Sequence, residues 1–283
     1  MGGGQWHKID SKDIVIIANI DMKKSILKID NTIEFIDEDL LLDGLNIAYL
    51  RQFFGDDAGW FFQQFLKMAY SFICTREFYL SFDCDCLLIR DLKININKPF
   101  LNAMPIKIDI NHPYFATIQK LLNIKIDSAH QYMCEFMIFN KNIMQDLCKV
   151  LNPRDSTLFY EPIIKLVSKN RDKYSFSEFE TYANFALAYD VYDFTYIPVY
   201  RCGGRFYNKI PTLQDSLLRD FAKVYYLLQF NHWDKPVWFA KILHNKFLRK
   251  ILGFKNLMRI YYYFGFYKKD FKNILMENNS EDK

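Results

Sequence analysis

Short apolar runs, several of them rich in β-branched residues, alternate along this chain with longer segments whose apolar residues have helical spacing. Residues 14–18 and 32–36 have the composition of buried strands, and the aromatic-rich amphipathic segment 59–71 leads directly into a third strand at residues 78–82. Strands that alternate with helices assemble into a mostly parallel sheet. The sequence therefore predicts an α/β fold, in which such a sheet is flanked by helices.

The later elements follow the same alternation. Asp37, Glu38 and Asp39 are expected to open a helix, and residues 128–140 are expected to supply another strand. Further helices are predicted at residues 143–151, 161–169, 178–188 and 217–230. Residues 189–200 are expected to be irregular or extended.

The composition is that of a globular protein with a large core. The chain has 283 residues, 51% of them hydrophobic, which suits one α/β domain with appendages or two closely packed lobes. Its six cysteines form no C-x-x-C pair and follow no secretory signal, so we expect reduced thiols in the cytoplasm. No uncharged apolar run is long enough to span a bilayer, and we expect any membrane contact to be peripheral.

Two carboxylates, Asp83 and Asp85, follow the strand at residues 78–82. In an extended strand, residues i and i+2 point to the same face, so both side chains could reach one hard divalent cation through oxygen ligands. Such a cation would suit a diphosphate. The alternative is that both are turn formers at a strand end, since a D-x-D tripeptide is common by chance.

Four separated segments between residues 14 and 235 favour the metal-site interpretation, because together they resemble one enzyme family. They resemble the G-W-x-x-Q-Q-x-x-K helix, the strand with its D-x-D, the central strand and the S-E-(Y/F)-E-x-Y segment of bacterial DxD-type glycosyltransferases with the GT-A fold. The matching segments here are residues 59–69, 79–88, 135–140 and 177–182. The resemblance implies a GT-A-like, Rossmann-type mixed sheet and a sugar-transfer reaction, without naming a substrate.

The resemblance also implies roles at the metal site. Asp85 would bind Mn(II) or Mg(II) directly, and Asp83 would contact the ribose or reach the metal through water. The metal would bridge the donor diphosphate and neutralise charge on the departing nucleotide. Many members add a histidine from the C-terminal part of the fold, and His232 is the best placed here, unless it simply packs beside Trp233. His130 could contact the donor sugar or phosphate.

Helical residues complete the predicted site. Gln64 and Lys67 share a helix face by their i, i+3 spacing and could point towards the donor, or Gln64 could face the core and Lys67 the solvent. Glu178, or as second choice Glu180, would be the general base that removes the proton of an acceptor hydroxyl. The alternative for both glutamates is charge that complements the N-terminus of a helix. A retaining enzyme can act without such a base, so inverting and retaining mechanisms both stay open.

Two domains are predicted, a GT-A-like catalytic domain at residues 1–234 and a helical tail at residues 235–283. GT-A enzymes usually place a strand and a helix before the strand that resembles residues 14–18. We therefore expect that this first β-α unit is missing or truncated in the chain, or that the sequence begins inside a longer reading frame. Either case bears on recognition of the nucleotide base.

The tail is basic and aromatic. Residues 235–272 contain ten Lys or Arg and one acid, Asp270, a local balance of +9 that leaves −5 for the rest of a chain with net charge +4. Apolar residues recur between the cations near helical spacing, as in an interfacial helix on anionic lipid: Trp238, Ile242 or Leu243, Phe247, Ile251, Phe254, Met258 and Tyr262. A helix docked on the catalytic core is the alternative. Nucleic acid is not expected as a partner, because no nucleic-acid motif accompanies the tail.

These observations lead to one hypothesis with two alternatives. The chain is predicted to be a metal-dependent hexosyltransferase that moves sugar from a nucleotide-diphosphate donor to a lipid-linked or oligosaccharide acceptor of a bacterial surface glycan, such as a lipooligosaccharide or capsule. It would lie peripherally on the inner face of the plasma membrane. The alternatives are an inactive or truncated relative that serves as a membrane-associated interaction module, and a D-x-D phosphotransferase or hydrolase acting on a diphosphate.

Overall fold

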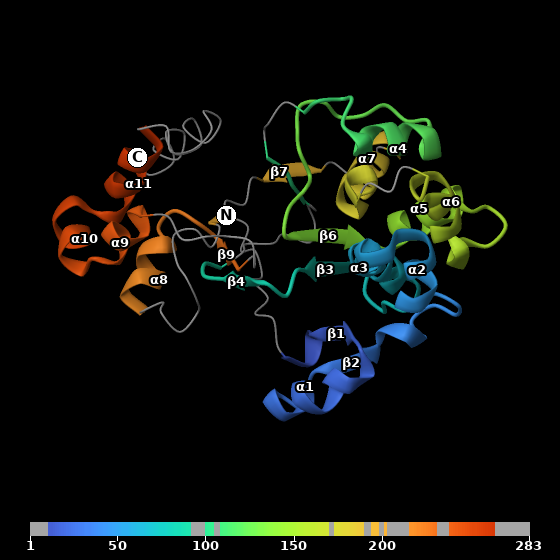
Figure 1. Ribbon diagram of the computed structural model, residues 1–283, viewed down its shortest axis with the longest axis horizontal. Coiled ribbons are helices and arrows are strands. Elements are labelled where there is room, and N and C mark those ends of the chain that lie inside the picture. The colour runs from blue at the N-terminus through green and yellow to red at the C-terminus, as the bar shows by residue number, and fades with distance from the viewer. Residues whose placement is uncertain are drawn as a thin grey trace, which may run out of the picture. The chain divides into compact units, whose positions relative to one another are not determined.

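The computed structural model describes residues 11–91, 100–104, 108–169, 173–189, 194–197, 201–202, 215–230 and 238–263. The chain forms two compact units. The first unit contains Met1–Ser81 and Ile94–Ile197, and the second contains Phe82–Lys93 and Pro198–Lys283. Helices and strands occur in both units (Figure 1), so the fold is mixed α/β, as predicted.

The first unit begins with a parallel strand pair joined by a helix. Strands β1 (Val15–Ala18) and β2 (Glu34–Asp37) are paired in register from Val15 with Glu34 to Ala18 with Asp37, and α1 (Lys23–Ile29) connects them. Both strands lie close to their predicted positions. This is the β-α-β arrangement that the alternating pattern indicated.

The helix expected to start at Asp37 is not formed there. Asp37 instead caps one 3-10 turn, Glu38–Leu40, by accepting a hydrogen bond from the Asp39 amide at 3.2 Å. Gly44 then adopts φ +77°, a left-handed conformation that a helix cannot continue through. The next helix, α2 (Ile47–Phe54), begins only after Asn46, whose side chain accepts from the Tyr49 amide at 2.8 Å.

Short strands and five further helices make up the rest of the first unit as far as its residues are described. Strand β3 (Phe78–Phe82) pairs with β6 (Phe136–Asn140), and β5 (Phe100–Asn102) pairs in parallel with β7 (Thr195–Ile197). The helices are α3 (Ala58–Ala69), α4 (Pro113–Leu122), α5 (Lys141–Leu151), α6 (Tyr160–Val167) and α7 (Glu178–Tyr189). Each predicted helix in this unit after residue 58 is confirmed within a few residues. The scattered apolar residues before position 128 gave no prediction of β5 or α4.

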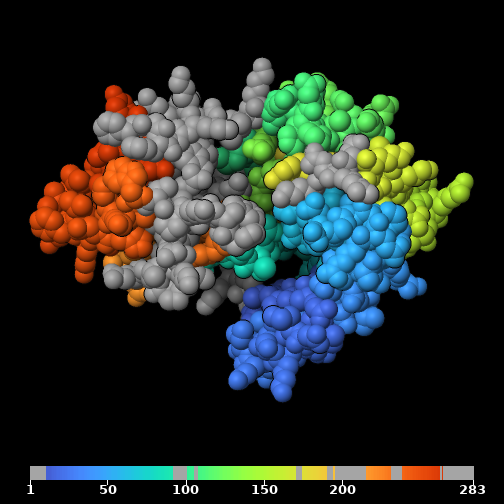
Figure 2. Space-filling view, viewed as in Figure 1, coloured from blue at the N-terminus to red at the C-terminus, as the bar shows by residue number. Residues whose placement is uncertain are grey.

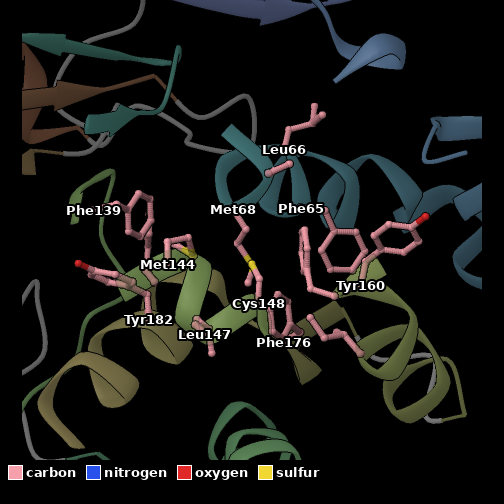
Figure 3. Packing of buried hydrophobic residues seen from close by; sticks show 14 of the residues in the cluster. Phe65, Leu66, Met68, Phe139, Met144, Leu147, Cys148, Tyr160, Phe176 and Tyr182 are labelled. Atoms are coloured by element: carbon pink, nitrogen blue, oxygen red, sulfur yellow. The ribbon is translucent and has the colours of Figure 1, made fainter. Parts of the chain in front are cut away.

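Aromatic and aliphatic side chains of α2, α3, α5, α6 and α7 form one buried cluster (Figure 3), and Phe115 and Ile118 of α4 form another with Ile126. On α3, Phe61, Phe65 and Met68 are fully buried on the face that i, i+4 and i+7 positions share. Every residue of β6 is buried, and so is every residue of α7 from Glu178 to Ala186. A helix buried all round has no solvent-facing side on which to place its polar residues. The carboxylates of α7 must therefore find partners inside the protein.

In its described residues, the second unit contains a three-stranded sheet and four helices. Strand β9 (Leu227–Gln229) lies between β4 (Cys86–Leu88), which is antiparallel to it, and β8 (Arg201–Cys202), which is parallel. The helices are α8 (Asp215–Phe221), α9 (Phe239–His244), α10 (Lys246–Leu252) and α11 (Phe254–Tyr263). The helix predicted over residues 217–230 is wrong beyond Phe221. Leu227 and Leu228 are fully buried in the strand, so pairing with β4 and β8 overrides the helical spacing.

Part of the predicted tail packs within this second unit. The Arg249 guanidinium of α10 is buried, with its Nε 2.9 Å from Asp220 Oδ2 of α8, and the rings of Phe221 and Phe254 lie 4.8 Å apart. The prediction placed a boundary at residue 234, whereas the compact unit joins residues on both sides of it. Within the described residues, no helix combines the length and apolar character needed to cross a membrane.

Candidate functional site

Helix α3 presents Gln64 and Lys67 to the interior of the first unit. Gln64 is 2% exposed, and its amide Nε2 donates to the carbonyl of Trp60, one turn earlier, at 3.1 Å. Its Oε1 accepts a hydrogen bond from the backbone amide of Glu178 at 3.1 Å. Gln64 therefore satisfies an amide in the first turn of α7, one of the groups that a helix leaves without an internal partner.

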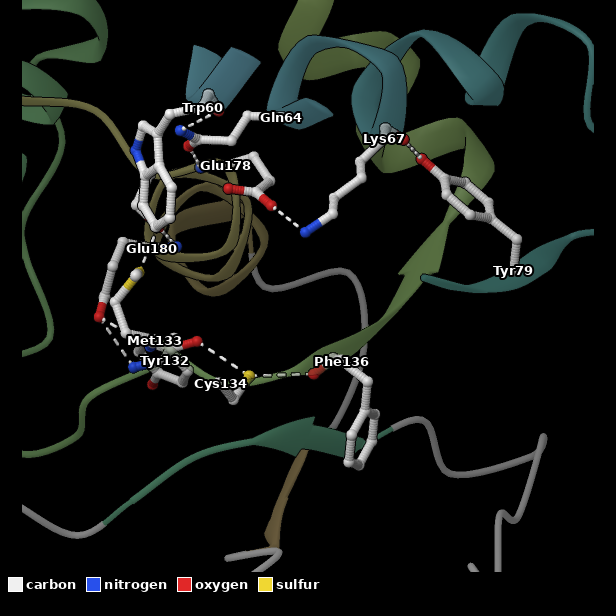
Figure 4. A network of polar contacts seen from close by, with 11 residues as sticks. Trp60, Gln64, Lys67, Tyr79, Tyr132, Met133, Cys134, Phe136, Glu178 and Glu180 are labelled. Atoms are coloured by element: carbon white, nitrogen blue, oxygen red, sulfur yellow. Dashed lines mark hydrogen bonds and ion pairs between the residues drawn. The ribbon is translucent and has the colours of Figure 1, made fainter. Parts of the chain in front are cut away.

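Lys67 faces the same helix and forms a buried ion pair. Its Nζ lies 2.8 Å from Oε1 of Glu178, and the two side chains are only 15% and 4% exposed (Figure 4). The same ammonium lies 4.4 Å from the centre of the Phe179 ring, within the range of a cation–π contact. Of the alternative given for this pair, the core-facing Gln64 is found and the solvent-facing Lys67 is not. Two of the four segments singled out in the sequence, 59–69 and 177–182, thus meet through named side chains.

Glu180 lies two residues after Glu178 but serves a different partner. Its Oε1 accepts from the backbone amides of Tyr132 and Met133, at 2.9 and 3.1 Å. Its Oε2 is buried without a hydrogen-bond partner in the part of the chain that the structure describes. Burial raises the pKa of Glu180 to about 7, even though the two amide hydrogen bonds lower it. Glu180 is therefore a buried carboxyl group that titrates near neutral pH.

The loop before β6 carries His130, and a carboxylate fixes that histidine. His130 Nδ1 lies 2.8 Å from Asp127 Oδ2, which also accepts from the Tyr132 hydroxyl at 2.5 Å. Burial would raise the pKa of Asp127, but these bonds and one from the Ala129 amide outweigh it and hold that pKa below its usual value. An ionised carboxylate accepts only, so Nδ1 of His130 is the donor. The His130 side chain is 25% exposed.

Asp127 was not singled out from the sequence, because the hydrogen bond that positions its segment joins residues far apart in the chain. The Asp127 amide donates to Asn184 of α7 at 2.7 Å, across 57 residues of sequence. Asn184 in turn donates to the Glu180 carbonyl at 2.9 Å. The only local signal was an acid three residues before a histidine, which is common and carries little information by itself.

Asp83 and Asp85 lie in a turn of the second unit, and the geometry assumed for them is wrong. Strand β3 ends at Phe82 and β4 begins at Cys86, whose amide donates to the Asp83 carbonyl at 3.2 Å and closes the turn between them. The rule that residues i and i+2 of a strand share a face therefore does not apply. Both aspartates are half-buried, whereas Cys84 between them is exposed. The Asp85 carbonyl accepts from the Phe230 amide at 2.8 Å, which ties the turn to the end of β9.

The remaining metal ligand expected from the sequence is His232. His232 lies outside the residues that the structure describes. Within the described ranges, no group of three or more His, Cys, Asp or Glu side chains is close enough together to hold a metal ion. Asp83 and Asp85 offer two hard oxygen donors, which fit Mn(II) or Mg(II) as part of a coordination shell completed by phosphate and water.

The raised pKa of Glu180 makes the stability of the protein depend on pH. A carboxyl whose pKa is higher in the folded state, about 7, than in the unfolded state, near 4.5, contributes stability at low pH that is lost as pH rises through this interval. We predict that wild type loses on the order of 3 kcal/mol of unfolding free energy relative to Glu180→Gln between about pH 4 and pH 8. Denaturant unfolding at several pH values measures it.

A matched control is Glu161→Gln, which changes an exposed glutamate of α6 and should leave the pH dependence of wild type intact. Asp127 is the charged group that raises the pKa of Glu180 through its own charge, so Asp127→Asn should shift the transition to lower pH. Parallel stability curves for wild type and Glu180→Gln would contradict the assignment.

Comparison with known proteins identifies one family. A family model described as "Family of unknown function (DUF6492)" matches residues 12–248, which include α3, the Asp83 to Asp85 turn and α7. The comparisons with curated proteins and with solved structures gave no match. Since the family model covers most of the sequence, the chain belongs to the DUF6492 family, a family of unknown function.

Proposed function

We propose that this protein is a metal-dependent glycosyltransferase that moves a hexose from a nucleotide-diphosphate sugar to a hydroxyl of a bacterial surface glycan. The observation that carries the proposal is the contact between the two helical segments that resemble such enzymes. Gln64 and Lys67 of α3 bind the first turn of α7 at Glu178, through bonds of 3.1 and 2.8 Å. Residues that the resemblance connects with one reaction are thus neighbours, which accidental matches in a sequence would not require.

The proposed fold is GT-A-like, with a mostly parallel sheet. The parallel pairs β1–β2 and β5–β7 support it, as does the β-α-β connection through α1. In the proposed site, Asp85 binds Mn(II) or Mg(II) and Asp83 contacts the metal through water or the ribose. The metal, when bound, would neutralise charge on the departing diphosphate. His232 remains the proposed third ligand, and His130, held by Asp127, the proposed contact to donor sugar or phosphate.

The proposed general base is Glu178, with Glu180 as second choice, and burial limits how either could act. Glu178 is 3% exposed and Glu180 1% exposed, so an acceptor hydroxyl or a bridging water must enter the cluster before a proton can transfer. Lys67 holds the Glu178 carboxylate in position. For Glu180, the oxygen without a hydrogen-bond partner among the described residues and the pKa of about 7 suit a base at neutral pH.

The acceptor is proposed to be lipid-linked or oligosaccharide, with the enzyme peripheral on the cytoplasmic face of the inner membrane. The direct test is a panel of nucleotide sugars with Mn(II), in which nucleotide release and acceptor product are both followed. Nucleotide release without a glycosylated product would indicate a diphosphate hydrolase or phosphotransferase. Nucleotide binding without any turnover would indicate an inactive relative that serves as an interaction module.

Asp85→Asn should abolish the metal-dependent part of nucleotide binding, because a neutral amide is a poor ligand for a hard divalent cation. Titration calorimetry with the nucleoside diphosphate, with and without Mn(II), measures this. Asp91→Asn, an exposed aspartate just after β4, is the matched control and should bind like wild type. Wild-type metal-dependent affinity in Asp85→Asn would rule out the proposed metal site.

Glu178→Gln should lower turnover by roughly two to four orders of magnitude while donor affinity stays nearly unchanged, as expected when a general base is lost. Steady-state kinetics and donor titration on the same preparation separate the two effects. Lys67→Met is the comparison, because it removes the ion pair and keeps the carboxylate. If Lys67→Met reduces turnover as much as Glu178→Gln, Glu178 acts only by position.

If Glu180→Gln alone lowers turnover in this way, Glu180 is the general base. If no variant lowers turnover, a retaining mechanism is favoured.

A further inference from the structure

Helices α9 to α11 expose large apolar side chains although they already have a buried side. Phe239, Leu243, Leu257 and Met258 are at most 3% exposed, and the rings of Phe239 and Tyr261 lie 5.0 Å apart. The core of this unit therefore has its own set of apolar residues. The additional apolar residues lie outside this core and are exposed, in the segment that Figure 2 colours orange and red.

These exposed side chains are unusual for the protein. Trp238, Phe247, Ile251 and Tyr263 are 58%, 69%, 61% and 72% exposed. Among the other large apolar residues that the structure describes, only Ile29 and Leu40 are as exposed as these four, at 85% and 80%. Single exposed apolar residues are ordinary, but with Leu252 and Ile260 at 42% and 40% the segment 238–263 has six, which indicates a contact surface.

The positive charge of the same segment favours an anionic partner. Residues 238–263 contain no Asp or Glu, and their lysines, Lys241, Lys246, Lys250 and Lys255, are all exposed. On α10, Lys246 and Lys250 are four residues apart, and so are Phe247 and Ile251, so each pair occupies adjacent turns of the helix. Cations beside apolar side chains on one helix surface are the arrangement that binds at the boundary of anionic headgroups and acyl chains.

We propose that this α10 surface, formed by Lys246, Phe247, Lys250 and Ile251, docks on an anionic lipid bilayer. Phe247 and Ile251 would enter the acyl boundary, while the two lysines would contact acidic headgroups. The proposal deepens the proposed function by naming the surface that brings the enzyme to a lipid-linked acceptor. The statement that this surface brings the enzyme to a lipid-linked acceptor rests on the proposed function. Lipid binding itself does not, since it can be measured without any transfer reaction.

The structure changes which residues of the predicted stripe can take part. Phe254, Met258 and Leu243, the last as an alternative to Ile242, were expected on the lipid-facing side, but they are buried within the unit. Arg249 is also withdrawn, because its guanidinium binds Asp220, Ser216 and the Leu243 carbonyl. The sequence predicted a single long interfacial helix. The structure instead has a short exposed helix surface on α10, within a folded unit.

The first experiment is sedimentation of the intact protein with vesicles of phosphatidylglycerol and phosphatidylcholine. We expect binding to vesicles rich in phosphatidylglycerol, weak binding to pure phosphatidylcholine, and a decline as salt rises, since headgroup attraction falls off within a Debye length. Lys246→Gln with Lys250→Gln should weaken binding at low salt roughly thirtyfold. Phe247→Ser with Ile251→Ser should remove the binding that persists at high salt.

Helix α1 and the 3-10 turn Glu38–Leu40 supply matched controls. Lys24 and Lys28 are also exposed and four residues apart, so Lys24→Gln with Lys28→Gln makes the same charge change elsewhere. Ile29→Ser with Leu40→Ser removes two apolar side chains of the first unit that are more exposed than Phe247 and Ile251. Neither control should change vesicle binding, and thermal melts should show all four variants folded, because every altered residue is exposed.

Three outcomes would overturn the proposal. The first is failure of the intact protein to sediment with phosphatidylglycerol vesicles at low salt. The second is an equal loss of binding in Lys24→Gln with Lys28→Gln, which would show a non-specific charge effect. The third is a concentration-dependent dimer in light scattering that Phe247→Ser with Ile251→Ser dissociates, because a second copy would then cover the surface. None of these results depends on whether the chain transfers sugar.

Discussion

The ion pair between Lys67 and Glu178 is the contact on which the interior of the first unit depends. It joins α3 to α7, and the neighbouring bond from the Glu178 amide to Gln64 spans 114 residues of sequence. A charge buried without a partner is strongly destabilising. If α3 and α7 moved apart, the ion pair would break and its charges would be left without their partners. Because α7 is buried on all sides up to Ala186, its position in turn determines where Glu180 and Asn184 bind the loop before β6.

The same helix assigns its two glutamates to different tasks. Glu178 is bound to a lysine ammonium, whereas Glu180 is bound to two neutral backbone amides and has its pKa raised to about 7 by burial. Two carboxyl groups two residues apart thus differ in chemistry because their surroundings differ. In the proposed reaction, Glu178 would be the base that Lys67 holds in position, and Glu180, the second choice, would be a group able to exchange protons near neutral pH.

Local sequence patterns predicted those helices and strands whose formation depends on the spacing of apolar residues within one segment. The spacing of Phe61, Phe65 and Met68 indicated α3, and the run before Asp83 indicated β3, because each buries one face in a regular way. What failed depends on contacts between distant segments. Residues 227–229 became a strand because β4 and β8 flank them, and the Asp83 to Asp85 pair lies in a turn closed by β4. Asp127 and the Lys67–Glu178 pair follow from how α7 packs, which sequence spacing does not encode.

A double-mutant cycle on Lys67 and Glu178 tests the central claim most directly, with unfolding free energy as the measured quantity. Lys67→Met and Glu178→Gln should each lose about 3–5 kcal/mol, because each leaves its buried partner without its counter-charge. The double variant should lose less than the sum, with a coupling on the order of 2 kcal/mol. Losses that add to within about 0.5 kcal/mol would show that the pair does not hold α3 and α7 together.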